Sequence, residues 1–181
     1  MRNPFRSIIM IQIRPETIND HSAVREVNLL AFGSEDESQL VETLRQSDDF
    51  IPELSLVAIN NGRVVGHILF SLISIETQKN DVSALALAPM AVRPEFQNHG
   101  IGSELVRHGL KECQRLGHKI VVVVGHPAYY PRFGFYSARA KGLEAPFQVS
   151  DEAFLVHELI PRALDGISGM VKYPPAFDEG T

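Results

Sequence analysis

The residues with the clearest chemical meaning form a turn between an apolar run and a long helical pattern. Gln97, Gly100 and Gly102 give this turn the spacing Q-x-x-G-x-G, and the last glycine falls inside the expected helix start. Such a turn presents several backbone N–H groups, and the first turn of a helix adds unpaired donors that attract an anion. Glycine is needed because a Cβ would keep phosphate oxygens away from the backbone. The stretch therefore predicts a binding site for pyrophosphate.

Two familiar phosphate-binding motifs are absent from the chain. The P-loop requires G-x-x-x-x-G-K-[ST], and no such string occurs in the sequence. The dinucleotide fingerprint requires a third glycine at position 105, where Leu105 stands. A P-loop nucleotidase and a nucleotide-binding oxidoreductase are therefore disfavoured. Neither motif accounts for the string A-V-x-P, residues 91–94, which lies just before the loop.

A second segment combines aromatic residues with groups that can carry protons. It reads H-P-A-Y-Y-P-R-F-G-F from residue 126 to 135, and Tyr130 stands four residues before Gly134. By composition alone Tyr130 is a packing residue, because several aromatic residues cluster here. Tyr129 is expected to lie in the core or to line a substrate pocket. Histidine is the side chain that ordinarily serves proton transfer at physiological pH, so His126 is either a proton relay or a structural histidine.

The remaining ionisable residues favour no further chemistry. The other histidines show no spacing typical of metal ligands, and with one cysteine we expect no metal site. Cys113 lies on the apolar side of a helical pattern, so it is expected in the core rather than as a nucleophile. Arg93 and Arg132 could contact the phosphates of a ligand, but we expect them to be solvated surface charges.

Apolar periodicity predicts the elements that position these residues. Strands are expected at 7–13, 54–60, 63–76, 84–92, 120–124, 153–159 and 169–173. Asn61-Gly62 predicts a β-hairpin between the second and third of these strands. Two helices are expected after Asp20 and Gly33, the first with Val24, Val27, Leu30 and Ala31 inward and the second with Leu40, Val41 and Leu44 inward. The clearest helix spans 100–117, with an apolar face of Ile101, Leu105, Val106, Leu110, Cys113 and Leu116 and with Gly117 just past its end.

Composition limits the class of protein. The chain has 181 residues, 44% of them hydrophobic and 22% charged, which is typical of one globular domain over 1–181. Its net charge of −5 argues against a nucleic-acid binder. The longest apolar stretch, 84–92, is too short to span a membrane. A single cysteine excludes an intrachain disulfide framework, and we expect a cytoplasmic protein.

Taken together, these motifs resemble the GNAT superfamily of acetyl-CoA-dependent N-acetyltransferases, in a bacterial type with an H-P-x-Y-Y-x-R-F-G-F segment. The resemblance rests on the A-V-x-P and Q-x-x-G-x-G loop, on the Tyr130–Gly134 spacing, and on the order of elements over about residues 7 to 140. It implies an α/β GNAT fold: a central, mixed and twisted sheet of about six to seven strands, with splayed fourth and fifth strands and about four flanking helices. Residues 140–181 would form a C-terminal extension of the sheet.

The resemblance also implies acetyl-CoA as the cosubstrate. Its pantetheine arm would pair with the backbone of Met90, Ala91 and Val92 on the fourth strand, and Pro89 fits a bulge or an unpaired edge there. The residues implied to hold the pyrophosphate are Gln97, Asn98, His99, Gly100, Ile101, Gly102 and Ser103. Asn98 and His99 depart from the family's usual Gly and Lys or Arg. Asn tolerates left-handed φ, whereas His99 would supply less fixed charge.

The implied reaction is transfer of an acetyl group from acetyl-CoA to a primary amine of a small-molecule or peptide acceptor. An N–H near Met90 or Ala91 would stabilise the oxyanion, and Tyr130 would protonate the departing thiolate. Glu35, Asp36 and Glu37 either border the acceptor site or form a solvated helix start. The alternative function is a regulatory module of GNAT fold that binds acyl-CoA without turnover. The tail 140–181 either covers the acceptor pocket or pairs with a second subunit in a homodimer.

Overall fold

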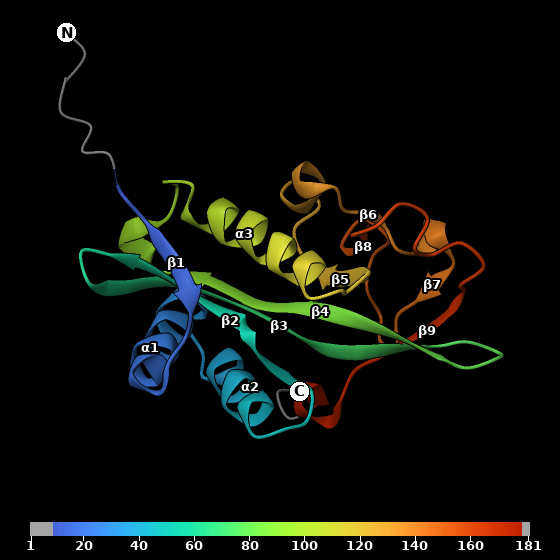
Figure 1. Ribbon diagram of the computed structural model, residues 1–181, viewed down its shortest axis with the longest axis horizontal. Coiled ribbons are helices and arrows are strands. Elements are labelled where there is room, and N and C mark those ends of the chain that lie inside the picture. The colour runs from blue at the N-terminus through green and yellow to red at the C-terminus, as the bar shows by residue number, and fades with distance from the viewer. Residues whose placement is uncertain (1–8, 179–181) are drawn as a thin grey trace, which may run out of the picture.

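The computed structural model describes residues 9–178, and nine strands within them form one twisted, mixed sheet (Figure 1). The strands are β1 Gln12–Pro15, β2 Phe50–Asn60, β3 Arg63–Glu76, β4 Asp81–Val92, β5 Ile120–Val124, β6 Tyr136–Ser137, β7 Leu143–Glu144, β8 Phe154–Glu158 and β9 Gly169–Lys172. Their order is β1-β2-β3-β4-β5-β8-β6, with β9 beside β3 and β7. The predicted mixed α/β sheet is confirmed, and the two-residue strands β6 and β7 add to its predicted number of strands. The tail beyond residue 140 extends this sheet through β7, β8 and β9.

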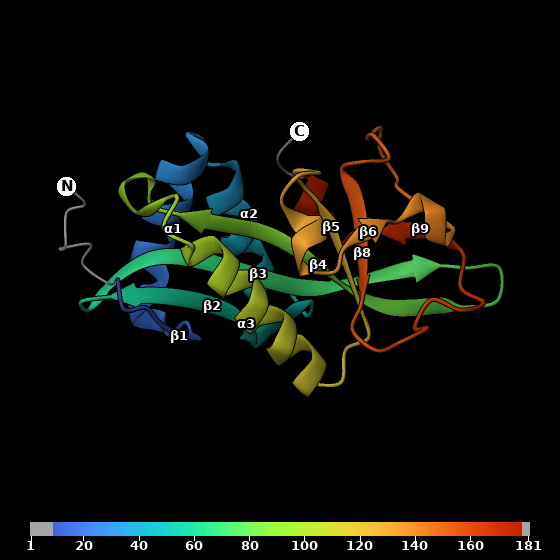
Figure 2. The same ribbon diagram turned by 90° about the horizontal axis from the view of Figure 1, so that it is seen from above.

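Helices cover both faces of the sheet. Helices α1 His21–Phe32 and α2 Asp36–Arg45 lie on one face, and α3 Ile101–Arg115 lies on the other (Figure 1). Viewed from above, β5, β8 and β6 lie beyond β4, away from β2 and α3 (Figure 2). Short 3-10 turns occur at Ile18–Asp20, Pro94–Phe96, Tyr130–Phe133, Arg139–Lys141 and Pro175–Asp178. Within residues 9–178, no helix combines the length and apolar character that crossing a bilayer requires.

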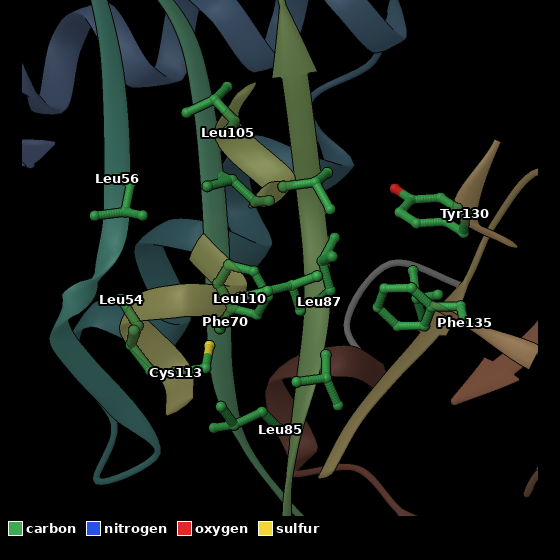
Figure 3. Packing of buried hydrophobic residues seen from close by; sticks show 14 of the residues in the cluster. Leu54, Leu56, Phe70, Leu85, Leu87, Leu105, Leu110, Cys113, Tyr130 and Phe135 are labelled. Carbon is green, nitrogen blue, oxygen red and sulfur yellow. The ribbon is translucent and has the colours of Figure 1, made fainter. Parts of the chain in front are cut away.

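The core beneath α3 explains why this helix lies so close to the sheet. Leu105, Leu110 and Cys113 of α3 pack with Phe70 and Leu87 of the sheet, as Figure 3 shows. A Cβ at Gly109 would overlap the Phe70 ring, so this glycine allows the close approach. The predicted core position of Cys113 is confirmed, and burial raises the pKa of its thiol well above the ordinary range.

Strands β4 and β5 are paired at one end and separate at the other. They are parallel and pair only through Leu85 with Val121 and Ala86 with Val122, although β4 continues to Val92. The other edge of β5 pairs with β8 along its whole length, from Ile120 with Glu158 to Val124 with Phe154. In the register of β3 with β4, one extra residue of β4 falls between Leu87 and Met90, which is a β-bulge at Ala88-Pro89. The predicted splay and the bulge at Pro89 are both present.

The hairpin at Asn61-Gly62 and the helix ended by Gly117 are confirmed, whereas other details of the predicted elements were wrong. The first strand begins at Gln12 and runs to Pro15, which an edge strand tolerates, and residues 7 and 8 lie outside the described residues. Asp20 precedes α1, but its carboxylate accepts hydrogen bonds from Arg14 and Thr17 and does not cap the helix.

Two leucines predicted to face the core are exposed. Leu30 is 45% exposed because it lies on the flank of α1, beside the stripe of Val24, Val27 and Ala31 that faces the sheet. Leu116 is 36% exposed because it follows Arg115, the last residue of α3, where the chain turns away.

Candidate active site

The loop between β4 and α3 is a compact turn with two left-handed residues. After Val92 the chain forms the 3-10 turn Pro94–Phe96, and Asn98 then adopts φ +63°. Gly100 has φ +81° and precedes the first residue of α3, so a residue with a Cβ would be strained there. The left-handed conformation of Asn98 is one that asparagine tolerates better than most other residues with a side chain. This turn sets the N-terminus of α3 beside the end of β4.

A cavity of about 670 Å³ lies between the end of β4 and the start of α3. Nine of the ten predicted cofactor residues line it: Met90, Ala91, Val92, Gln97, Asn98, Gly100, Ile101, Gly102 and Ser103. The tenth, His99, does not line the cavity; it is exposed, and its ring hydrogen-bonds the carbonyl oxygen of Gln97 at 2.8 Å. The loop can thus bring backbone N–H groups and a helix N-terminus to one anionic ligand.

Side chains hold the loop to the sheet from within. The Gln97 amide Nε2 donates to the Val92 carbonyl oxygen at 3.0 Å, which closes the turn. Arg93 was predicted to be a solvated surface charge, and this is wrong, since it is 3% exposed. Its guanidinium donates to the Val64 carbonyl oxygen at 2.8 Å and to the Glu26 carboxylate at 3.1 Å. These partners compensate the buried charge and fix the end of β4.

Gly102 lines the cavity at a position with little room for a side chain. A Cβ at this position would lie 3.0 Å from the Tyr129 hydroxyl oxygen and 3.2 Å from the Met90 methyl carbon. The Tyr129 hydroxyl also hydrogen-bonds Ser103 at 3.3 Å. Tyr129 therefore lines the cavity, and Arg132 lies over its ring at 4.8 Å and lines the cavity as well.

Tyr130 follows β5 and lies across the separation from β4. It is 8% exposed, and its ring packs edge-on against Tyr129 and Phe135 at centroid distances of 5.2 and 5.6 Å. A Cβ at Gly125 would overlap this ring, so that glycine makes room for it. The hydroxyl is directed toward β4 (Figure 3) and has no hydrogen-bond partner among residues 9–178. Burial raises the pKa of Tyr130 to about 12, so the phenol is protonated at neutral pH.

The other proposed proton carriers lie outside the cavity. His126 is exposed, and its Nδ1 accepts a hydrogen bond from the Ala128 amide at 3.1 Å, which is a local turn contact. Its role as a proton relay stays a prediction. Glu35 pairs with Arg25 at 2.7 Å, while Asp36 and Glu37 form the first turn of α2. This acidic run therefore has the geometry of a solvated helix start.

Residues 12–138 match the family model described as the acetyltransferase (GNAT) domain. The chain belongs to the GNAT acetyltransferase family. It is 35% identical over 167 residues to the N-acetyltransferase YhbS of Escherichia coli K12, which covers 92% of this chain and 98% of that protein. It is also 40% identical over 135 residues to the N-acetyltransferase YjhQ of the same organism, which covers 74% and 75%.

Solved structures agree with this assignment. The crystal structure of Escherichia coli YhbS in complex with CoA superposes with a TM-score of 0.87 at 31% identity, over 98% of this chain and 96% of that one. A GNAT acetyltransferase from Brucella melitensis in complex with acetyl-CoA gives a TM-score of 0.76 at 31% identity, over 93% and 99%. The GNAT fold is confirmed, and the chain is an acyltransferase.

The cavity also includes residues that were not predicted to bind the cofactor. Ala31 and Phe32 line the cavity because the end of α1 lies against it, and only the tertiary structure brings them there. Arg132 looked like an ordinary surface charge, and it is exposed but borders the cavity. Tyr129 was expected either in the core or at a pocket. It packs against the core cluster and also lines the cavity.

Proposed function

We propose that this protein is an N-acetyltransferase that moves the acetyl group of acetyl-CoA directly to a primary amine. One observation carries the proposal: a single cavity is bounded by the free end of β4, by the start of α3 and by the Q-x-x-G-x-G loop. This arrangement offers an unpaired strand edge to an extended amide chain and a helix N-terminus to a diphosphate. The acceptor is a small-molecule or peptide amine.

The donor would be held largely by backbone groups. Met90, Ala91 and Val92 lie beyond the last residue of β4 that pairs with β5, so their free groups on that side can bond a pantetheine arm. The amides of 97–103 and the dipole of α3 would bind the pyrophosphate. Since the His99 side chain hydrogen-bonds the loop backbone, the loop itself would bind the pyrophosphate through its amides, and Arg132 is the cationic side chain in the lining of the cavity.

The reaction requires a neutral amine, an oxyanion donor and a proton for sulfur. The acceptor nitrogen forms a bond to the acetyl carbon while a backbone N–H of Met90 or Ala91 holds the oxygen that becomes negative. The carbon–sulfur bond then breaks, and the sulfur takes a proton from the Tyr130 phenol. The proton lost by the nitrogen restores the phenol, so the products are an amide and free CoA thiol.

A two-part experiment tests this function. Acetyl-CoA should raise the melting temperature, whereas NADH and ATP should not, because the loop lacks the motifs those ligands need. Free CoA thiol should then be released only when a suitable amine from a broad panel is added. Equal stabilisation by NADH would contradict the site. Binding without release for every amine would instead identify an acyl-CoA sensor.

A further inference from the structure

A second cavity, of about 540 Å³, lies along β4 directly next to the first. Its floor is formed by residues 86–88 of β4 and by Val122 and Val124 of β5. We call the first cavity, between the end of β4 and the start of α3, the donor cavity. On β4 only Pro89, in the bulge, separates Ala88 of the second cavity from Met90 of the donor cavity. A molecule bound here would therefore lie beside the stretch of β4 that we propose to hold the thioester.

The opposite wall of this cavity is aromatic and comes from the C-terminal tail. Phe147, Tyr173 and Phe177 form a chain of ring contacts, with centroids 5.6 Å apart for the first pair and 5.0 Å for the second. The Phe147 ring is 44% exposed, although it lines the cavity. Aromatic rings with free faces and edges favour another ring as a ligand. The floor adds only aliphatic side chains, so the cavity as a whole is apolar.

The lining of this cavity holds one cationic and one anionic residue. Lys172 and Asp178 are the two charged residues of the lining, and Lys172 forms an ion pair with Glu76. A polycationic acceptor, such as an aminoglycoside or a polyamine, would need several carboxylates, which the lining within residues 9–178 does not offer. An amine attached to an apolar group would bury that group without leaving charges unpaired.

We propose that this second cavity holds the apolar part of the acceptor, and that the acceptor is an arylalkyl primary amine, in which a short alkyl chain joins the amino group to an aromatic ring. The inference rests on the proposed function and names the substrate class for it. The volume is in the range of small-molecule sites, and the ring would lie against Phe147 and Tyr173 with its amine toward Ala88. The tail thus selects the acceptor, while β4 and α3 hold the donor.

Steady-state kinetics with matched amines tests the proposal. With acetyl-CoA as donor, kcat/KM should be at least about tenfold higher for 2-phenylethylamine than for ethylamine, because burying the ring adds binding. Phe147→Ala should abolish most of this preference, mainly by raising KM for the aromatic amine. Ile18→Ala removes an exposed side chain that lines neither cavity and should keep the preference.

Three outcomes would overturn the proposal. The first is equal kcat/KM for both amines, and the second is a preference for spermidine. The third is a Phe147→Ala variant that changes the selection among acetyl-, butyryl- and hexanoyl-CoA rather than among amines, since the cavity would then hold the acyl chain.

A binding measurement separates failure of this proposal from failure of the proposed function. If no amine is acetylated, the proposed function fails, and the cavity is tested by titrating 2-phenylethylamine into the CoA-saturated protein in a calorimeter. We expect binding that Phe147→Ala weakens about tenfold and that Ile18→Ala leaves unchanged. Absence of binding, or equal binding by Phe147→Ala, would overturn the assignment of the cavity.

Discussion

The phenol of Tyr130 lies beside the separation of β4 and β5, with its hydroxyl directed toward β4 (Figure 3). Tyr130→Phe keeps the ring and its contacts with Tyr129 and Phe135 but removes the proton that we assign to the departing sulfur. We expect kcat to fall by about 10²-fold, with little change in the Kd of acetyl-CoA, because the loss affects the transition state.

Leaving-group acidity offers a control for Tyr130. The defect of Tyr130→Phe should shrink with thioesters of more acidic thiols, since a better leaving group needs less help from an acid. Parallel measurements of kcat with acetyl-CoA and with such an analogue provide the comparison. A variant with wild-type kcat would return Tyr130 to the role of a packing residue.

His67 is a buried histidine of β3, opposite Ala91 of β4, and it predicts a dependence of stability on pH. Burial lowers its pKa to about 4, and the neutral ring hydrogen-bonds Asn28 at 3.2 Å and Ser55 at 3.0 Å. Between pH 6.5 and 4, His67 binds a proton in the unfolded chain but stays neutral in the folded protein. The free energy of unfolding must therefore decrease as pH falls. The loss attributable to His67 is up to about 3 kcal/mol.

Urea unfolding at several pH values measures this effect. His67→Gln should flatten much of the decrease between pH 6.5 and 4, while some slope remains because burial also lowers the pKa of His118 and His157. The pKa of Asp20, about 2, places its contribution below this window, since its stabilisation is lost only as pH falls from about 3.8. An unchanged slope in His67→Gln would contradict the assignment.

The first turn of α3 connects the fold to ligand binding. Gly102→Val would place a branched side chain against the Tyr129 hydroxyl and the Met90 methyl group and fill part of the donor cavity. We expect acetyl-CoA to lose its effect on the melting temperature, while the protein stays folded. Glu104→Val is the matched control, because it adds the same side chain at an exposed position of the same turn. Unchanged acetyl-CoA affinity in Gly102→Val would show that the loop does not bind the pyrophosphate.

The elements that sequence predicted best are those with a strong local pattern. Asn61-Gly62 fixes the hairpin of β2 and β3, and the apolar stripe of α3 is complete up to Cys113. Elements set by distant contacts were harder to predict. The two-residue strands β6 and β7 exist only because β8 and β9 pair with them, and the range of β1 depends on its register with β2.

At the scale of the whole molecule, two cavities lie side by side along β4, and the chain builds them in different ways. Most of the donor cavity comes from one stretch between Met90 and Ser103, so these residues could be predicted from their spacing, whereas Ala31, Phe32, Tyr129 and Arg132 join it from other elements. The second cavity joins β4 and β5 to Phe147, Tyr173 and Phe177, which are distant in sequence from the strands that they cover. No local pattern marks these aromatic residues, because the pairing of β9 with β3 brings the tail back across the sheet.

The central claim is that the protein transfers acetyl from acetyl-CoA directly to an amine. The most direct test is mass spectrometry of the reaction with acetyl-CoA labelled with ¹³C in the acetyl group and 2-phenylethylamine or another amine that releases CoA. The account predicts one labelled acetyl group on the amine nitrogen for each CoA thiol released, and no transfer by Gly102→Val. Labelled free acetate without labelled amide, or bound acetyl-CoA that stays intact with every amine, would contradict it.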